Sequence, residues 1–155
     1  MHAATRLKHG GFDVSGSWAM AENRDLVLPL GIPDAPGVYA FAAGGKLLYV
    51  GVATSLRRRL AAHRRSGGRI ATLIGAALRR GQRIDILIAI DIPNTKFGGL
   101  PVTTAVGLEH GLIAHFQPAW NRLGITDPDP ALAAARSDAA RRAWQTMRQR
   151  PRAEI

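Results

Sequence analysis

The chain has 155 residues, the length of one compact domain with a substantial buried core. Lysine and arginine number 21 against 11 aspartates and glutamates, so the net charge of +10 favours an anionic polymer, nucleic acid above all, over a membrane as the partner. Cysteine is absent, which excludes disulfides, thiolate catalysis and cysteine-ligated zinc. The first residues contain no apolar core of signal-peptide length, so we expect a cytoplasmic protein.

The first half of the sequence predicts an extension followed by a β-hairpin. Residues 1–36 are mixed in composition and predict an N-terminal extension without an assigned function. Strands are predicted over 37–42 and 47–50, joined by a turn that contains Gly44 and Gly45.

Helices and one further strand follow the hairpin. Cap residues and apolar spacing predict helices from Thr54 or Ser55 to about Arg65, over 69–80, and from Thr103 or Thr104 to about Phe116, where Pro118 stops the last one. β-Branched residues over 84–92 predict a third strand, and 94–99 is expected to be a loop. This order predicts an α/β (α+β) fold with a small three-stranded antiparallel sheet flanked by helices. A basic C-terminal tail over 125–155 adds a helix at about 131–149.

The register of the hairpin decides whether Tyr39 and Tyr49 can act together. A strict two-residue turn pairs Tyr39 with Val50 and puts the two phenols on opposite faces of the sheet. A three-residue loop, or an equivalent bulge, aligns Phe41 with Tyr49 and brings Tyr39 to the same face. We expect the loop or bulge; the alternative is that both tyrosines are packing residues.

The helix after the hairpin is rich in arginine. At about 100° per residue, Leu56, Leu60 and His63 share one side, and Arg59 lies at its edge beside His63. His63 is therefore either a functional residue or a partly buried histidine with its hydrogen bonds satisfied. The remaining arginines either contact phosphate or are simply solvated: Arg57, Arg58, Arg64 and Arg65.

Glu109 lies in the apolar stripe of the helix that ends at Phe116. A buried carboxylate needs a compensating cation or strong donors. If Glu109 is a functional residue, a divalent metal compensates its charge; if its role is structural, a salt bridge to Arg59 does so.

These motifs resemble, in content and order, those of the GIY-YIG nuclease family, which includes the excision-repair nuclease subunit and homing endonucleases. Gly37-Val38-Tyr39 and Tyr49-Val50-Gly51 have valine where the family name has isoleucine. Arg59, His63, Glu109 and Asn121 follow at the expected places, so the resemblance runs from Pro36 to about Asn121 and implies a nuclease domain over 37–124. Val52 stands where many family members carry lysine.

The resemblance implies an endonuclease that hydrolyses DNA phosphodiester bonds with the help of a divalent ion, in repair, restriction or a mobile element. It implies that Glu109 holds Mg²⁺ or Mn²⁺ and that Asn121 supports the site. The implied catalytic residues are Tyr39, Tyr49, Arg59, His63, Glu109 and Asn121. The main alternative is a catalytically silent nucleic-acid-binding module of the same fold, and a basic structural or ribosome-associated protein is a third.

Overall fold

The structure is a computed structural model that describes residues 1–65 and 67–121. The C-terminal helix expected at about 131–149, and the tail over 125–155 that contains it, lie outside the described residues. None of the described helices is long and apolar enough to cross a membrane.

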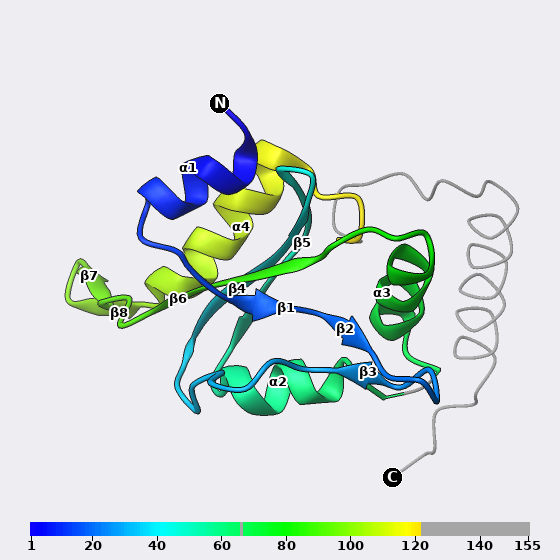
Figure 1. Ribbon diagram of the computed structural model, residues 1–155. Coiled ribbons are helices and arrows are strands. Elements are labelled where there is room, and N and C mark those ends of the chain that lie inside the picture. Colours follow the sequence, from blue (N-terminus) through cyan, green and yellow to red (C-terminus); the bar gives the residue numbers. More distant parts are fainter. Residues whose placement is uncertain (66, 122–155) are drawn as a thin grey trace, which may run out of the picture. The chain divides into compact units, whose positions relative to one another are not determined.

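The main sheet has four antiparallel strands in the order β1-β6-β4-β5 (Figure 1). They are β1 (Asp13–Ser17), β4 (Gly37–Ala43), β5 (Lys46–Ala53) and β6 (Asp85–Ile90). The three strands expected from the sequence are all present, but the expected strand number was wrong, because β1 pairs with β6 at the sheet edge. β1 carries polar residues, a glycine and a register shift at Val14–Gly16, and so lacks the alternating pattern that identifies a strand.

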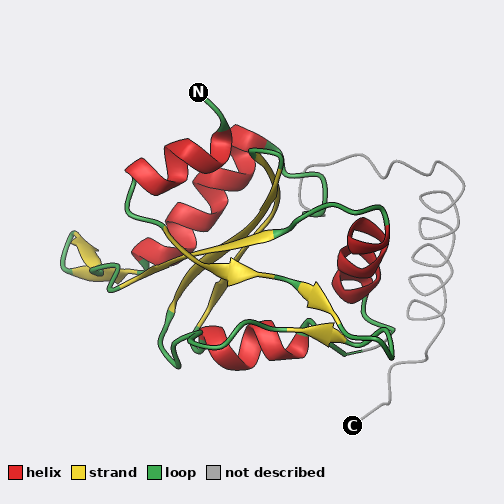
Figure 2. Ribbon diagram, in the orientation of Figure 1, coloured by secondary structure: helices red, strands yellow, loops and turns green. Residues whose placement is uncertain are grey.

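Four helices flank this sheet in the described part of the chain: α1 (Ala3–His9), α2 (Leu56–Ala62), α3 (Arg69–Arg79) and α4 (Thr104–Phe116) (Figure 2). Ser55 caps α2, since its Oγ accepts a hydrogen bond from the Arg58 backbone N–H at 3.2 Å. Helix α2 ends three residues before the expected Arg65. Helix α4 ends where expected, with Gln117 in the left-handed conformation and Pro118 after it.

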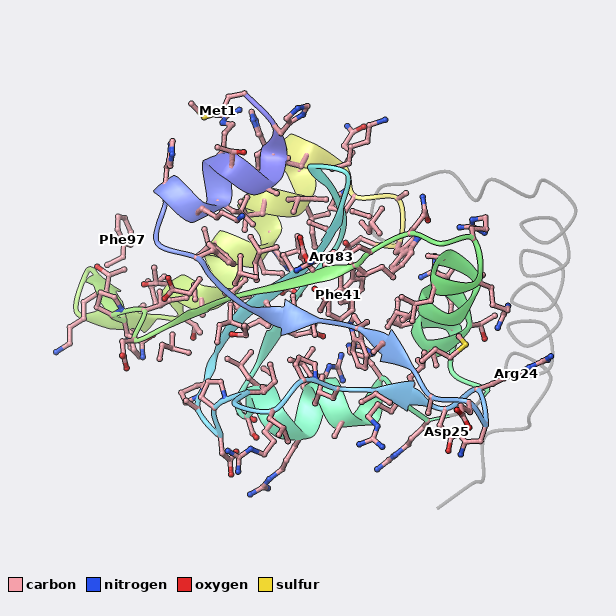
Figure 3. All side chains as sticks on the ribbon, in the orientation of Figure 1. Met1, Arg24, Asp25, Phe41, Arg83 and Phe97 are labelled. Carbon is pink, nitrogen blue, oxygen red and sulfur yellow. The ribbon has the colours of Figure 1, made fainter. Side chains whose placement is uncertain are left out.

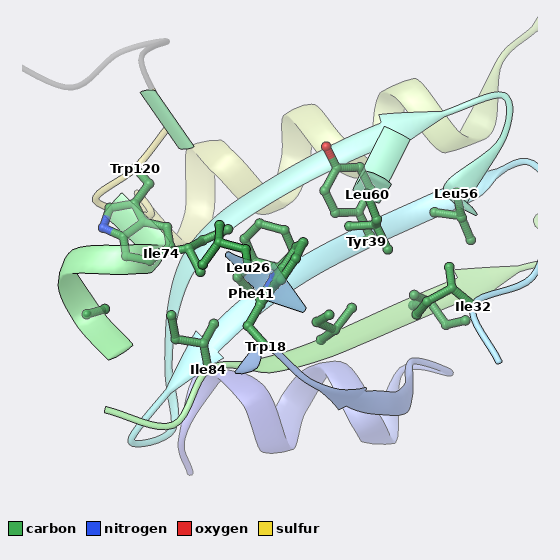
Figure 4. Packing of buried hydrophobic residues seen from close by; sticks show 13 residues of the cluster. Trp18, Leu26, Ile32, Tyr39, Phe41, Leu56, Leu60, Ile74, Ile84 and Trp120 are labelled. Carbon is green, nitrogen blue, oxygen red and sulfur yellow. The ribbon is translucent and has the colours of Figure 1, made fainter. Parts of the chain in front are cut away.

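The two faces of the sheet bury two separate apolar clusters, so the fold has three layers. On one face, Tyr39 and Phe41 pack with α2, α3 and residues of the N-terminal segment, including Trp18 (Figure 4). On the other face, Val38 and Val50 pack with α1 and α4. The side chains of β4 alternate between these clusters, which explains why this central strand is buried on both faces.

Two small ribbons complete the described fold: β2 (Ala19–Met20) with β3 (Leu26–Val27), and β7 (Thr95–Phe97) with β8 (Leu100–Val102). The second ribbon corrects the expectation of a loop at 94–99. Gly98 and Gly99 both have positive φ, 57° and 82°, as a tight two-residue hairpin turn requires. The three-residue strands are too short to produce a recognisable alternation, and Phe97 at the tip is 81% exposed (Figure 3).

Candidate active site

The hairpin of β4 and β5 places both tyrosines on one face of the sheet, as expected. Ala42 pairs with Leu47 and Phe41 with Tyr49, so Leu48 is an extra residue that forms a bulge beside the Gly44-Gly45 turn. The bulge shifts the register by one, and Tyr39 then faces Gly51. Of the two expected arrangements, a three-residue loop or an equivalent bulge, the bulge is therefore confirmed.

Four rings gather on this face and form an aromatic cluster: Tyr39, Phe41, Tyr49 and His63. Their ring centroids lie 5.6 to 5.8 Å apart, with Tyr49 stacked on Phe41 and His63 edge-on to Tyr49. His63 reaches the cluster from the residue after α2 because Leu56 and Leu60, on the same side of the helix, are buried against the sheet. Phe41 was not expected as a site residue, although it supports both Tyr49 and His63.

Tyr39 is held by two hydrogen-bonding partners from α2 and its C-cap. Its hydroxyl lies 2.7 Å from His63 Nε2, and Arg59 Nε donates to the same hydroxyl oxygen at 3.4 Å. Because a guanidinium can only donate, Tyr39 Oη is the acceptor from Arg59 and its own proton is available for His63 Nε2. His63 is then the neutral tautomer that carries its proton on Nδ1.

Burial sets the protonation of this group. It raises the pKa of the fully buried Tyr39 above its ordinary value, with Tyr49 adding to the effect. Burial, helped by the nearby Arg59 charge, lowers the pKa of His63 to about 4. The hydrogen bond to Tyr39 raises the pKa of Arg59, and the charge interaction with Tyr49 acts in the same direction. At neutral pH the site thus holds a neutral phenol, a neutral imidazole and a guanidinium that interacts with both tyrosines.

The glycines of the two tripeptides are required by close approaches. A Cβ atom at Gly51 would lie 2.6 Å from both Cζ and Oη of Tyr39, because the Tyr39 ring lies directly over this residue. A Cβ at Gly37 would collide with the backbone oxygen of Ala89 on β6 and lie 3.1 Å from Leu56 Cδ1. Gly51 therefore makes room for the Tyr39 ring, and Gly37 lets α2 and β6 approach β4.

The four arginines predicted to meet phosphate differ in their surroundings. Arg57 Nε donates to the backbone oxygen of Ile32 at 3.0 Å, and Arg64 Nε donates to that of Leu26 at 3.0 Å. Each of these two residues binds the N-terminal segment through its Nε, and its terminal amino groups make no hydrogen bond to the described residues. Arg58 and Arg65 are exposed and make no side-chain hydrogen bond to the described residues. A contact with phosphate remains a prediction for all four.

Asn121 is buried and fastens the chain to the edge strand β5. Its Oδ1 accepts from the Val50 N–H at 2.9 Å, and its Nδ2 donates to the Val50 carbonyl at 2.7 Å. The Trp120 N–H also donates to the Leu48 carbonyl at 2.8 Å, while Arg69 binds the Trp120 carbonyl. The Asn121 amide therefore pairs with Val50 as a neighbouring strand would, and it fixes the backbone between Tyr49 and Gly51.

Glu109 is half-buried on α4, at the margin of the stripe whose buried member is Ile113. The salt bridge to Arg59 that was the structural alternative is not formed, and Glu109 has no hydrogen bond or ion pair to any residue of the described ranges. Helix α4 packs on the Val50 face, so Glu109 and the aromatic cluster belong to helical layers on opposite faces of the sheet.

Val52, at the position of the family's common lysine, packs among apolar residues of the α4 face. Because side chains alternate along β5, Val50 and Val52 point to one face and Tyr49 and Gly51 to the other. The lysine position therefore belongs to the Glu109 face of the sheet rather than to the tyrosine face.

The sequence is similar to part of a known protein. The chain is 34% identical over 113 residues to the UvrABC system protein C of Pseudomonas aeruginosa (strain LESB58), and 36% identical over 94 residues to that of Klebsiella pneumoniae (strain 342). These matches cover 72% and 59% of the chain but only 15% and 13% of the relatives, so the chain spans a small part of their length. No model of a known protein family matches the sequence.

A solved structure adds a likeness in fold. A mutant of bacteriophage T4 EndoII superimposes with a TM-score of 0.64 at 19% identity, covering 77% of this chain and 99% of that one. At this identity the likeness concerns the fold alone. The order of its motifs resembles that of the GIY-YIG nuclease family, and both the similarity to the UvrABC system protein C and the likeness in fold agree with this resemblance.

Proposed function

We propose that this protein is a divalent-metal-dependent DNA endonuclease that hydrolyses phosphodiester bonds. The observation that carries the proposal is the aromatic cluster with Arg59 beside it: the Tyr39 phenol is hydrogen-bonded to a neutral imidazole and a guanidinium, and the Tyr49 ring lies next to it, in a protein with a net charge of +10. The sequence similarity to the UvrABC system protein C supports an activity on DNA.

Tyr49 is the phenol that we assign as general base. It is half-buried, whereas Tyr39 is fully buried, so Tyr49 is the phenol that an attacking water can reach. In its phenolate form it accepts a proton from that water as the water oxygen forms a bond to phosphorus and the bond from phosphorus to the leaving oxygen breaks. The leaving oxygen takes its proton from solvent. Because only the phenolate can accept this proton, we expect the rate to rise as the pH is raised.

Arg59 stabilises the charge that develops on the substrate. The guanidinium interacts with both tyrosines, and its terminal nitrogens can bind the phosphate on which negative charge develops. Tyr39 and His63 are positioning residues in this scheme, since Tyr39 accepts from Arg59 and donates to His63. This chain of bonds fixes the Arg59 side chain before the substrate arrives.

Glu109 is the residue that would hold the metal. Its carboxylate is half-buried and has no partner within the described ranges, where no group of three or more histidine, aspartate and glutamate side chains gathers. A single protein carboxylate suits Mg²⁺ or Mn²⁺, ions that keep several waters and share phosphate oxygens with the protein. Such an ion would supply Lewis-acid polarisation of the phosphate. A phosphate that meets both Glu109 and Tyr49 would lie at the edge of β5, where the two faces of the sheet meet.

Nicking of supercoiled plasmid with Mg²⁺ or Mn²⁺ tests the proposal. We expect the wild-type protein to convert supercoiled to open-circular DNA, and Glu109→Ala and Arg59→Ala to lose this activity by a factor of about 100 or more. Arg83→Ala is the matched control, because Arg83 is exposed and, among the described residues, its side chain bonds Ser17 and Asp85 rather than a residue of the cluster. Equal nicking by the wild type and both site variants would identify a contaminant and refute the enzyme proposal.

A silent DNA-binding module is the second candidate, and Val52 is the observation that favours it. An apolar residue at the lysine position removes one proton-transfer group from the site. The same plasmid assay separates the two functions, since a silent module retards DNA on a gel without nicking it in either metal.

A further inference from the structure

A cleft of about 150 Å³ lies between α3 and the turn that joins β2 to β3. None of the residues of the aromatic cluster lines it. Three arginines do, from three separate parts of the chain: Arg24 in the turn, Arg64 after α2 and Arg79 at the end of α3. Figure 3 labels Arg24 and its neighbour Asp25 at this turn.

The backbone of Arg24 and the side chains of Arg64 and Arg79 are positioned by their surroundings. Arg24 has a left-handed backbone with φ of 69°, and its N–H closes the turn by donating to the Ala21 carbonyl at 2.9 Å. Arg64 Nε donates to the Leu26 carbonyl, which leaves its two terminal amino groups for a ligand. Arg79 lies across Gly75, where a Cβ would be 3.3 Å from its Nη1. Gly75 therefore lets the Arg79 guanidinium lie against the helix on the cleft side.

The three arginines of the cleft face a single acidic residue in its lining. Asp25 is the acidic residue of its lining, and the Asp25 carboxylate accepts a hydrogen bond from Asn23 Nδ2 at 2.8 Å rather than an ion pair from an arginine. No ion pair joins any of the three arginines to an acidic residue of the described ranges. Three guanidinium groups around one cleft repel one another unless an anion binds between them, and their planar donor pattern matches phosphate.

We propose that this arginine cleft binds a backbone phosphate of the nucleic-acid substrate, at a subsite beyond the aromatic cluster. The inference rests on the proposed function for its choice of ligand. Arg64 lines the cleft and follows His63 of the cluster directly in the chain, so one DNA strand that presents a phosphate to Arg59 would present a further one to the cleft. A contact of this kind positions the duplex without reading its sequence.

Binding without cleavage tests the cleft. The full chain carrying Glu109→Ala is titrated into a short fluorescein-labelled duplex without metal, and the dissociation constant is measured by anisotropy at several KCl concentrations. Adding Arg24→Ala or Arg79→Ala should weaken binding and reduce the salt slope by about one unit each. Arg80→Ala is the matched control, because it neighbours Arg79 but does not line the cleft, and it should leave the slope unchanged.

Thermal unfolding of each variant shows that it is folded, and inorganic phosphate is titrated in the same assay. Salt slopes unchanged in folded Arg24→Ala and Arg79→Ala proteins, or an equal loss in Arg80→Ala, overturn the proposal. The proposal is also overturned if inorganic phosphate stabilises the wild type while the salt slopes of DNA binding are the same in the wild type and the variants. In that case the cleft binds free phosphate rather than DNA. If the wild type never nicks plasmid yet the slopes fall as expected, the endonuclease proposal fails and the cleft stands.

Discussion

Replacing Gly51 with alanine is the sharpest test of how the two tripeptides cooperate. The new methyl group would lie 2.6 Å from Cζ and Oη of Tyr39, about 1 Å closer than carbon atoms normally approach. Tyr39 is fully buried, and the rings of Phe41 and Tyr49 lie 5.6 and 5.8 Å from its own, so it cannot move aside without losing its 2.7 Å hydrogen bond to His63. Overpacking of this kind costs about 1–3 kcal/mol.

Urea unfolding followed by tryptophan fluorescence measures this cost, and thermal unfolding should show a drop of about 2–4 °C for each kcal/mol. The matched control is Gly107→Ala on α4, where no atom lies within 4 Å of the new Cβ. Alanine is the better helix former by up to about 1 kcal/mol, so this variant should be more stable than the wild type. A Gly51→Ala protein with a wild-type unfolding midpoint and wild-type nicking would refute the idea that this glycine makes room for Tyr39.

Four further outcomes are expected. Asn121→Ala removes both hydrogen bonds to Val50 and should cost about 1–3 kcal/mol in urea unfolding, with faster hydrogen exchange at the Val50 amide; unchanged exchange would contradict this role. His63 has a folded-state pKa of about 4 against 6.5 for the free group, so the unfolded chain binds the proton first and stability is lost as the pH falls from about 6.5 towards 4. His63→Gln should reduce this acid loss of unfolding free energy by an amount on the order of 1–2 kcal/mol. Profiles of unfolding free energy against pH that run parallel in the two proteins would count against a buried neutral imidazole. Nicking should rise with pH, because the general base acts as a phenolate. Tyr49→Phe should abolish this rise, whereas Tyr39→Phe should lower the rate but retain the rise; the reverse pattern would assign the base to Tyr39. Chelation with EDTA should stop nicking and leave retardation of the duplex on a gel intact, so loss of both would mean that the metal acts through folding or binding.

The sequence predicted the parts of the site that depend on strong local patterns. Tyr39 and Tyr49 could be placed on one face because the register rule leaves few choices, and Arg59 and His63 followed from the position of Leu60 on its helix. The bulge at Leu48 was one of two equivalent solutions, and no pattern in the residues distinguishes them.

Other parts depend on contacts that no local pattern encodes. β1 pairs with β6, from which residues 18–84 separate it in the sequence, and it has little apolar alternation, so it was missed. The helical wheel put Glu109 in the apolar stripe, but the depth of burial depends on how α4 rests on the sheet, and this carboxylate is only half-buried. The arginine cleft joins Arg24 to Arg79 through the fold alone.

The alternation along β4 and β5 also separates two kinds of substitution within the motifs. Val38 and Val50, which replace the isoleucines of the family name, are fully buried in the cluster of α1 and α4 and point away from both tyrosines. The loss of one methyl group at each is therefore a matter of packing and leaves the phenols in place. Val52 has the same orientation, so a lysine there would add a cation on the face that carries Glu109. Val52→Lys should consequently alter the metal dependence of nicking more than its alkaline pH dependence, since the second property belongs to Tyr49 on the other face.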